Sequence, residues 1–220
     1  MSTARNVRKH FIVLCVSIIS AFSLAASAAA ISNSVSENSM TIDANLDDWA
    51  SIASLGYDAD TLSDVNAQAD YLEGWLAHDS SSVYIAYRNN GDINRSAWWS
   101  WQVFLDTDSS QTSGYQSGSG LGAEYLLQGP GLFKYTGSGT DWSWQHVGWP
   151  TNAVDGAIAE FKIPRDLLGD PTQYRAVFNA RNNAFTGSFA ASGTDTYPKS
   201  RSILGLHDDL LFRQYAIWLE

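Results

Sequence analysis

The sequence predicts an all-β protein, a two-sheet antiparallel β-sandwich of the jelly-roll or immunoglobulin-like kind with about ten strands and one or two short helical turns. Short segments rich in aromatic and β-branched residues recur between turn residues, which is typical of strands. No stretch of about twelve residues keeps a helical period of apolar positions. A chain of this length buries roughly 70% of its unfolded surface, so its core needs no disulfide.

The expected strands follow one another along the whole chain after the leader. They are 40–43, 71–78, 83–88, 98–105, 123–128, 132–135, 142–147, 155–163, 174–180 and 214–219. Helical turns are expected at 46–53 and at 164–168, where Pro164 can open a turn without losing a hydrogen bond. The long loops 106–122 and 182–211 are expected either to bind a ligand or to be held in place by one, because loops of that length are uncommon in a compact domain.

Residues 1–30 have the pattern of a secretory signal peptide, with basic residues, then an apolar stretch, then small residues. We expect cleavage near residues 28–30, a flexible N-terminal segment over 31–39 and a single domain over 40–220. The single cysteine, Cys15, lies in the leader, so the mature chain crosses an oxidising compartment without forming disulfides. The sequence predicts a periplasmic or extracellular protein that is not inserted in the membrane after cleavage.

The charge of the mature chain argues against a nucleic-acid partner. Removing residues 1–30 leaves ten Lys and Arg against 23 Asp and Glu, a formal charge of −13. Such a surface repels phosphates. We therefore expect no nucleic-acid partner.

Asp106 and Asp108 form a candidate metal site. They lie one residue apart where an expected strand meets a hydroxyl-rich loop, and carboxylates are the hard oxygen ligands that Ca²⁺ prefers. The loop lacks the Gly and Glu positions of an EF-hand. The alternative is that both carboxylates cap the turn by accepting hydrogen bonds from backbone amides.

Clustered tryptophans are the most distinctive feature of the sequence. They are Trp98, Trp99 and Trp101, then Trp142 and Trp144, then Trp149. Alternation along a strand places Trp98 opposite Trp99 and Trp101, and both faces cannot be core. We expect some indoles to be exposed and to stack on sugar rings, and Trp142 and Trp144 to share one face. The alternative is aromatic core filling.

An enzymatic alternative rests on Glu124 and Glu160. A glycoside hydrolase or polysaccharide lyase needs carboxylates across a cleft, and both residues lie within expected strands. Glu160 alternates with Ile158 and Lys162 on the face opposite Phe161, which predicts a solvated side chain paired with a cation.

Several short runs together resemble a known family. They are TID at 41–43, DDW at 47–49, VYIAY at 83–87, VFLD at 103–106 and SGY at 113–115. Their order over residues 40–219 resembles the family 9 carbohydrate-binding modules and the related DOMON-like sandwiches.

The resemblance implies a non-catalytic β-sandwich with structural calcium and a sugar clamped between two aromatic residues. It points to Trp98 or Trp99 as one clamp residue and to Tyr197 as the other, where the family has a tryptophan. It also implies a structural role for Glu124. Some DOMON-like relatives bind haem through Met with His or Lys, and here that ligand would be Met40.

Taken together, the sequence predicts a secreted, non-catalytic protein that binds an oligo- or polysaccharide, at a chain end or short segment, with a calcium-stiffened loop. The expected ligand-binding residues are Trp98, Trp99, Trp101, Trp142, Trp144 and Tyr197, and the expected metal ligands are Asp106 and Asp108. The alternatives are the enzyme described above, an envelope or matrix assembly protein, and a haem-binding domain.

Overall fold

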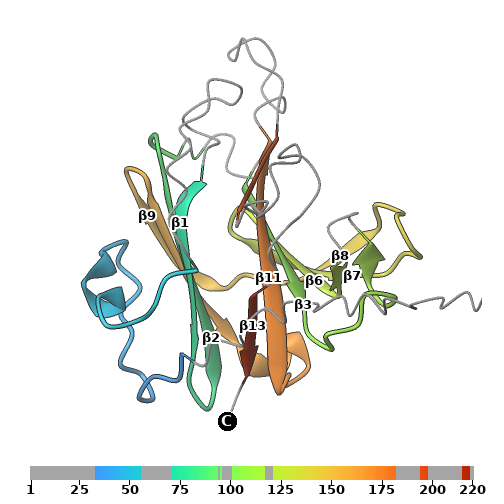
Figure 1. The fold of residues 1–220 in the computed structure, drawn as a ribbon, viewed down its shortest axis with the longest axis horizontal. Helices are drawn as coiled ribbons and strands as arrows, with labels where there is room; N and C mark the ends of the chain where they lie inside the picture. Colours follow the sequence, from blue (N-terminus) through green and yellow to red (C-terminus); the bar gives the residue numbers. More distant parts are fainter. Residues whose placement is uncertain are drawn as a thin grey trace, which may run out of the picture.

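In a computed structural model of the chain, two antiparallel β-sheets pack face to face, which confirms the predicted all-β sandwich (Figure 1). The structure describes residues 33–55, 71–93, 95, 101–116, 121–181, 194–197 and 215–218. For residues 180–181, 194–197 and 215–218 the description covers the backbone alone.

The first sheet, sheet A, has four strands in the order β1-β2-β10-β9. They are β1 (Tyr71–His78), β2 (Ser82–Asn89), β10 (Ile158–Pro164) and β9 (Thr151–Asp155). Sheet A therefore joins an early hairpin to a late one by pairing β2 with β10.

The second sheet, sheet B, runs in the order β12-β11-β3-β6-β7-β8, and β13 also pairs with β11. Its strands are β12 (Thr194–Tyr197), β11 (Gln173–Arg181), β3 (Trp101–Asp106), β6 (Tyr125–Gln128), β7 (Gly131–Tyr135), β8 (Trp144–Gly148) and β13 (Tyr215–Trp218). A small hairpin of β4 (Tyr115–Gln116) and β5 (Gly122–Ala123) lies between β3 and β6 in the chain.

The central core lies between the two sheets and takes alternate residues of their strands. On β2 the inward residues are Val83, Ile85 and Tyr87, and on β3 they are Trp101, Val103 and Leu105. Aromatic rings bridge the sheets: for example, the Tyr71 ring meets the Phe178 ring edge to face, with centroids 5.7 Å apart.

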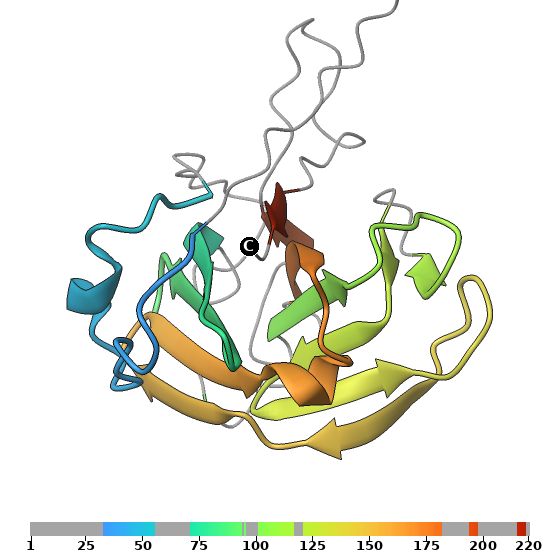
Figure 2. The same ribbon diagram turned by 90° about the horizontal axis from the view of Figure 1, so that it is seen from below.

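A second hydrophobic layer covers the outer face of sheet A. The segment 33–55, which contains the 3₁₀ turn η1 (Leu46–Trp49), crosses that face (blue in Figure 2). Its contacts bury Trp49 against Trp75 and the outward residues of β1 and β2. This cover accounts for two of the tryptophans.

A third hydrophobic layer lies on the outer face of sheet B. It buries the outward residues of β3, β6 and β11 beneath the β4–β5 hairpin and the start of β8. Its buried members are Phe104, Leu121, Ala123, Leu126 and Val177, with Tyr115, Phe133 and Trp144 packed against them. The sandwich therefore buries aromatic side chains in three layers.

Most predicted elements are confirmed, and the differences have physical causes. The hairpin β1–β2 and the helical turns at η1 and η4 (Arg165–Leu168) form as expected. The expected strand 155–163 is wrong at its start, because Asp155 ends β9 and Gly156 turns the chain with a φ of 51°. An Asp-Gly pair is a strong hairpin signal.

The N-terminal expectations also need correction. Residues 40–43 form no strand and instead belong to the cover on sheet A. The described part of the expected flexible segment, residues 33–39, is bonded to β1: the Val35 N–H donates to the His78 carbonyl at 2.9 Å, and the His78 N–H donates to the Asn33 carbonyl at 3.1 Å. A segment held in this way is part of the domain.

Candidate functional site

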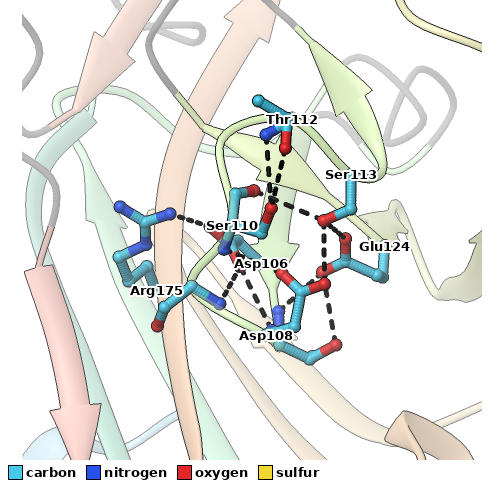
Figure 3. A network of polar contacts seen from close by, with 9 residues as sticks. Asp106, Asp108, Ser110, Thr112, Ser113, Glu124 and Arg175 are labelled. Atoms are coloured by element: carbon cyan, nitrogen blue, oxygen red, sulfur yellow. Dashed lines mark hydrogen bonds and ion pairs between the residues drawn. The ribbon is translucent and has the colours of Figure 1, made fainter.

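Three carboxylates converge beside the outer hydrophobic layer of sheet B. Asp106 is the last residue of β3, Asp108 follows in the loop, and Glu124 lies between β5 and β6. Each offers an oxygen atom, and the three oxygens lie within 4.8 Å of one another (Figure 3). Pairing of Leu105 with Tyr125 brings the two chain segments together.

The capping role predicted for the aspartates is present. One Asp106 oxygen accepts hydrogen bonds from the N–H groups of Asp108 at 3.2 Å and Ser109 at 2.6 Å. Asp108 accepts from the Ser110 N–H at 2.8 Å. Capping uses oxygen lone pairs without consuming them all, so it does not exclude a cation.

One hydroxyl lies between two carboxylates of the cluster. Ser113 Oγ is 2.8 Å from Asp108 Oδ2 and 3.1 Å from Glu124 Oε1. A hydroxyl carries one proton and can donate to one of these oxygens at a time. When Asp108 and Glu124 are both ionised, Ser113 can donate its proton to only one of them. The oxygen of the other carboxylate then faces the negative charge of its neighbour without a hydrogen bond from Ser113.

The charge balance of the cluster is negative. Arg175, which pairs with Asp106 across β11 and β3, makes an ion pair with Asp106 and is the cation that contacts the cluster within the described ranges. Burial raises the pKa of Asp106, although Arg175 and backbone N–H groups oppose the rise. Burial also raises the pKa of Glu124, against the Thr107 N–H bond, and the charges of Asp108 and Asp106 raise it further.

This donor set fits Ca²⁺. All its ligand atoms are carboxylate or hydroxyl oxygens, and the three carboxylates exceed the single guanidinium by two negative charges. No nitrogen or sulfur ligand of the kind that zinc prefers is part of the cluster within the described residues. Asp106, Asp108 and Glu124 are therefore the residues that would hold the ion.

An aromatic cluster adjoins the carboxylates. We call Phe104, Tyr115, Tyr135, Trp142 and Trp144 the outer aromatic cluster. The Tyr115 ring stacks on Phe104 with centroids 5.7 Å apart, and Trp142 stands nearly perpendicular to Tyr115 at 5.3 Å. Trp144 lies 5.1 Å from Tyr135 and 5.5 Å from Tyr115. Trp142 is 48% exposed, so the cluster reaches the surface.

The carboxylates and the outer aromatic cluster share one loop. Ser113 bonds the carboxylates, and Tyr115 lies two residues further on, across Gly114 with a φ of +64°. A Cβ atom on Gly114 would lie 2.5 Å from the backbone of Ala123, so glycine is required there. Any ion that fixes Ser113 and its loop also fixes the position of Tyr115.

The predicted sugar-binding residues fall into three groups. Trp142 and Trp144 lie together on the outer face of sheet B as expected. Trp101 is 2% exposed in the central core and cannot meet a ligand, because its side of β3 faces sheet A. Trp98 and Trp99 lie outside the described residues, and so does the side chain of Tyr197, whose backbone belongs to β12.

The predicted environment of Glu160 is wrong. Its carboxylate is fully buried and accepts hydrogen bonds from the N–H groups of Asp43 and Ala44 and from the Trp49 indole. Burial raises its pKa, and the three donors oppose the rise. The side chain meets the cover on sheet A in place of solvent and the expected cation. This tertiary contact cannot be recognised from the sequence.

Glu124 and Glu160 do not form a catalytic pair. Glu124 lies on the outer side of sheet B with Thr107 and Ser113, and Glu160 faces the cover on the outer side of sheet A. The two outer faces point away from each other (Figure 2). Two carboxylates that attack one glycosidic bond must face a common cleft.

The haem ligand expected from the DOMON-like resemblance is buried. Met40 is 7% exposed and packs in the layer with Trp49 and Trp75. Its thioether serves as hydrophobic contact for the cover on sheet A.

Sequence reasoning gave no role to several residues at the site. Ser113 and Arg175 reach the carboxylates through loop closure and cross-strand pairing. Ser113 and Tyr115 both belong to the SGY run. The glycine between them was the sequence signal for a tight turn at this place.

Comparisons with known proteins found no matching family model, no similar curated protein and no similar solved structure. The resemblance to family 9 modules thus stays a prediction from short motifs. In the described part of the chain, no helix has the length and apolar character needed to cross a membrane.

Proposed function

We propose that this chain is an exported, non-catalytic carbohydrate-binding protein whose ligand stacks on Trp142, with Ca²⁺ held by Asp106, Asp108 and Glu124. The observation that carries the proposal is the placement of Trp142. Its indole is 48% exposed, yet it packs against Tyr115, Phe104 and Trp144 at centroid distances of 5.3 to 6.2 Å.

A large indole held by aromatic neighbours and open to solvent suits the apolar C–H face of a sugar. Its orientation is fixed before the ligand arrives, which lowers the entropy cost of binding. Ser143 follows Trp142 in the chain, and its hydroxyl oxygen lies 2.9 Å from that of Thr136 on the connection that leads into β8. Sugar hydroxyls could exchange hydrogen bonds with this rim.

Calcium bound by the carboxylates would stabilise the surface around Trp142. The loop from Asp106 to Tyr115 carries both the carboxylates and one wall of the outer aromatic cluster. An ion that neutralises the carboxylates would remove their repulsion and hold the loop in the binding geometry.

A glycan array followed by affinity gel electrophoresis tests the proposal. We expect Trp142→Ala to weaken glycan binding by about tenfold or more, the loss of one stacking ring. Gln145→Ala is the matched control, because Gln145 is exposed on the same strand but faces away from the outer aromatic cluster. Unchanged binding by Trp142→Ala, or no glycan bound by the wild type, would refute the proposal.

An assay for reducing sugar addresses the enzyme alternative. A binding protein releases none from the polysaccharides that it retains. Release that persists in the purified protein and is lost in Glu124→Gln would instead support a hydrolase or lyase.

A further inference from the structure

A β-bulge changes which side of sheet B the end of β8 faces. Leu132 pairs with Gly148. The next residue on β7, Phe133, pairs with His146, so Val147 is an extra residue on β8. Val147 packs against the central core, and a Cβ atom on Gly148 would lie 3.1 Å from Leu167, which also packs there.

The bulge brings Trp149 to the outer face. In a regular strand, residues three apart face opposite sides, so His146 and Trp149 would be separated by the sheet. The extra residue places the side chains of His146 and Trp149 on the same side of the sheet, and their ring centroids lie 4.4 Å apart. Trp149 also lies above Gly131, where a Cβ atom would be 3.4 Å from its ring.

Four rings therefore follow one another on the outer face of sheet B, in β8 and directly beside it, and we call them the β8 aromatic row: Trp142, Trp144, His146 and Trp149. The first two ring centroids are 5.6 Å apart, and the last two are 4.4 Å apart. Trp144 and His146 are two residues apart on one face of the strand, a rise of about 7 Å. The row is thus longer than a single sugar ring.

Aromatic residues of the neighbouring strand, β7, pack against the two middle rings of the β8 aromatic row. Tyr135 on β7 pairs with Trp144, and Phe133 pairs with His146. The corresponding ring centroids are 5.1 Å and 5.3 Å apart. Both middle rings of the row are held in place by these partners.

Exposure is concentrated at the two ends of the row. Among the residues that the structure describes, the large hydrophobic side chains that stand exposed are Trp142 at 48% and Trp149 at 70%. A contiguous exposed apolar patch marks a binding surface, and here both exposed indoles belong to one row of rings. β8 is the edge strand of sheet B, and at the other end of the row Trp142 packs against Phe104 of β3, so the row spans part of the outer face of the sheet.

The negative charge of the chain favours an uncharged ligand over an anionic one. The mature chain is strongly acidic, and Asp141 lies next to Trp142. An anionic polymer would be repelled, whereas an uncharged one would not. Rings spaced along a strand suit a neutral chain laid lengthwise, with successive sugar units over successive rings.

Building on the proposed function, we infer that Trp149 is a second sugar-binding residue and that the ligand is an internal stretch of a neutral polysaccharide lying along β8. The sequence had predicted binding at a chain end or short segment. A chain end would occupy Trp142 alone, whereas a longer chain reaches Trp149.

The test measures how affinity depends on the length of the ligand, in the wild type and in variants of the two exposed indoles. Isothermal titration calorimetry would use di-, tetra- and hexasaccharides of neutral β-1,4- and α-1,4-glucans, native and with their reducing ends reduced by borohydride. We expect affinity to rise with length and to survive reduction. Trp149→Ala should weaken hexasaccharide binding about tenfold and leave disaccharide binding unchanged. Trp149→Tyr should restore most of the loss, and Gln145→Ala should change neither.

The outcomes separate the inference from the proposed function. If Trp142→Ala abolishes binding but Trp149→Ala matches the wild type at every length, or if reduction of the chain end abolishes binding, the inference is wrong and the proposed function stands. If the wild type binds some glycan on the array but no neutral glycan chain, the inference is wrong and the proposed function stands; if it binds no glycan at all, both fall. Thermal melts of the two alanine variants confirm that they are folded.

Discussion

The Trp49 indole donates a hydrogen bond of 2.5 Å to Glu160, which joins the cover on sheet A to the middle of β10. The same carboxylate accepts the N–H groups of Asp43 and Ala44, and Ala44 has a φ of 65°. One buried carboxylate thus satisfies three donors of a segment that has little regular structure of its own. The cover is held by polar contacts as well as by hydrophobic packing.

Glu160→Ala should destabilise the protein by about 3 kcal/mol, because it leaves two buried donors, the Ala44 N–H and the Trp49 indole, and the partly buried Asp43 N–H without their acceptor. Chemical denaturation measures the loss. Glu73→Ala, which breaks a partly exposed ion pair with Arg88, is the control and should cost less than about 1 kcal/mol. Equal losses in the two variants would contradict this account of Glu160.

Asp79 should make stability depend on acid pH. Burial would raise its pKa, but hydrogen bonds from Tyr84, Ser81, Asn38 and Ser82 outweigh burial and lower it from 3.8 to about 2. The folded state therefore binds this proton less readily than the unfolded state, and its stabilisation, about 2 kcal/mol at neutral pH, is lost as pH falls from 3.8 to about 2. Unfolding free energies of wild type and Asp79→Asn should differ at neutral pH and converge near pH 2; a constant difference would refute the role.

Calcium should raise the melting temperature. A ligand that binds the folded state alone stabilises it by mass action, so EDTA should lower the midpoint by several degrees. Glu124→Gln should abolish the difference between calcium and EDTA, because it removes a charged ligand. Asp155→Asn, at an exposed position on β9, should retain it. No difference in the wild type, with no calcium found by elemental analysis, would leave capping as the role of the aspartates.

The effect of calcium should grow with pH. The pKa values of Asp106 and Glu124 are raised in the folded protein, so without the ion the fold loses stability as pH rises from the ordinary carboxyl range through these raised values. Calcium displaces the protons and removes the repulsion, so its affinity should fall on acidification. Calcium titrations from the ordinary carboxyl range up to neutral pH measure this dependence; affinity independent of pH would contradict the role of these two groups.

The sequence was sufficient for what depends on neighbours along the chain. Strand alternation correctly placed Trp101, Val103 and Leu105 on one face, and the carboxylates of Asp106 and Asp108 were recognisable in their loop. It could not assign that face to the core, because alternation separates two sides without saying which is covered. Counting indoles suggested that two sheets could not bury them all, but the cover on sheet A buries Trp49 and Trp75, and the layer on the outer face of sheet B partly buries Trp144.

The orientation of Trp149 could not be predicted from the sequence for another reason. Its side of the sheet depends on one extra residue at Val147, and a bulge is set by pairing with β7 and by packing against the core. Glu160 shows the same limit, since its donors are more than a hundred residues away in the chain. Register and distant covers are properties of the assembled fold.

The pairing of the N-terminal segment with β1 closes an edge that could otherwise recruit another chain. Carbonyl groups on alternate residues of this strand, at Gly74, Leu76 and His78, accept from the Leu55 N–H, the Asn33 side chain and the Val35 N–H. Unpaired strand edges are templates for aggregation. Pairing these groups of the edge within the chain leaves fewer of them open to a strand of another molecule, which disfavours fibril-like association at high local concentration.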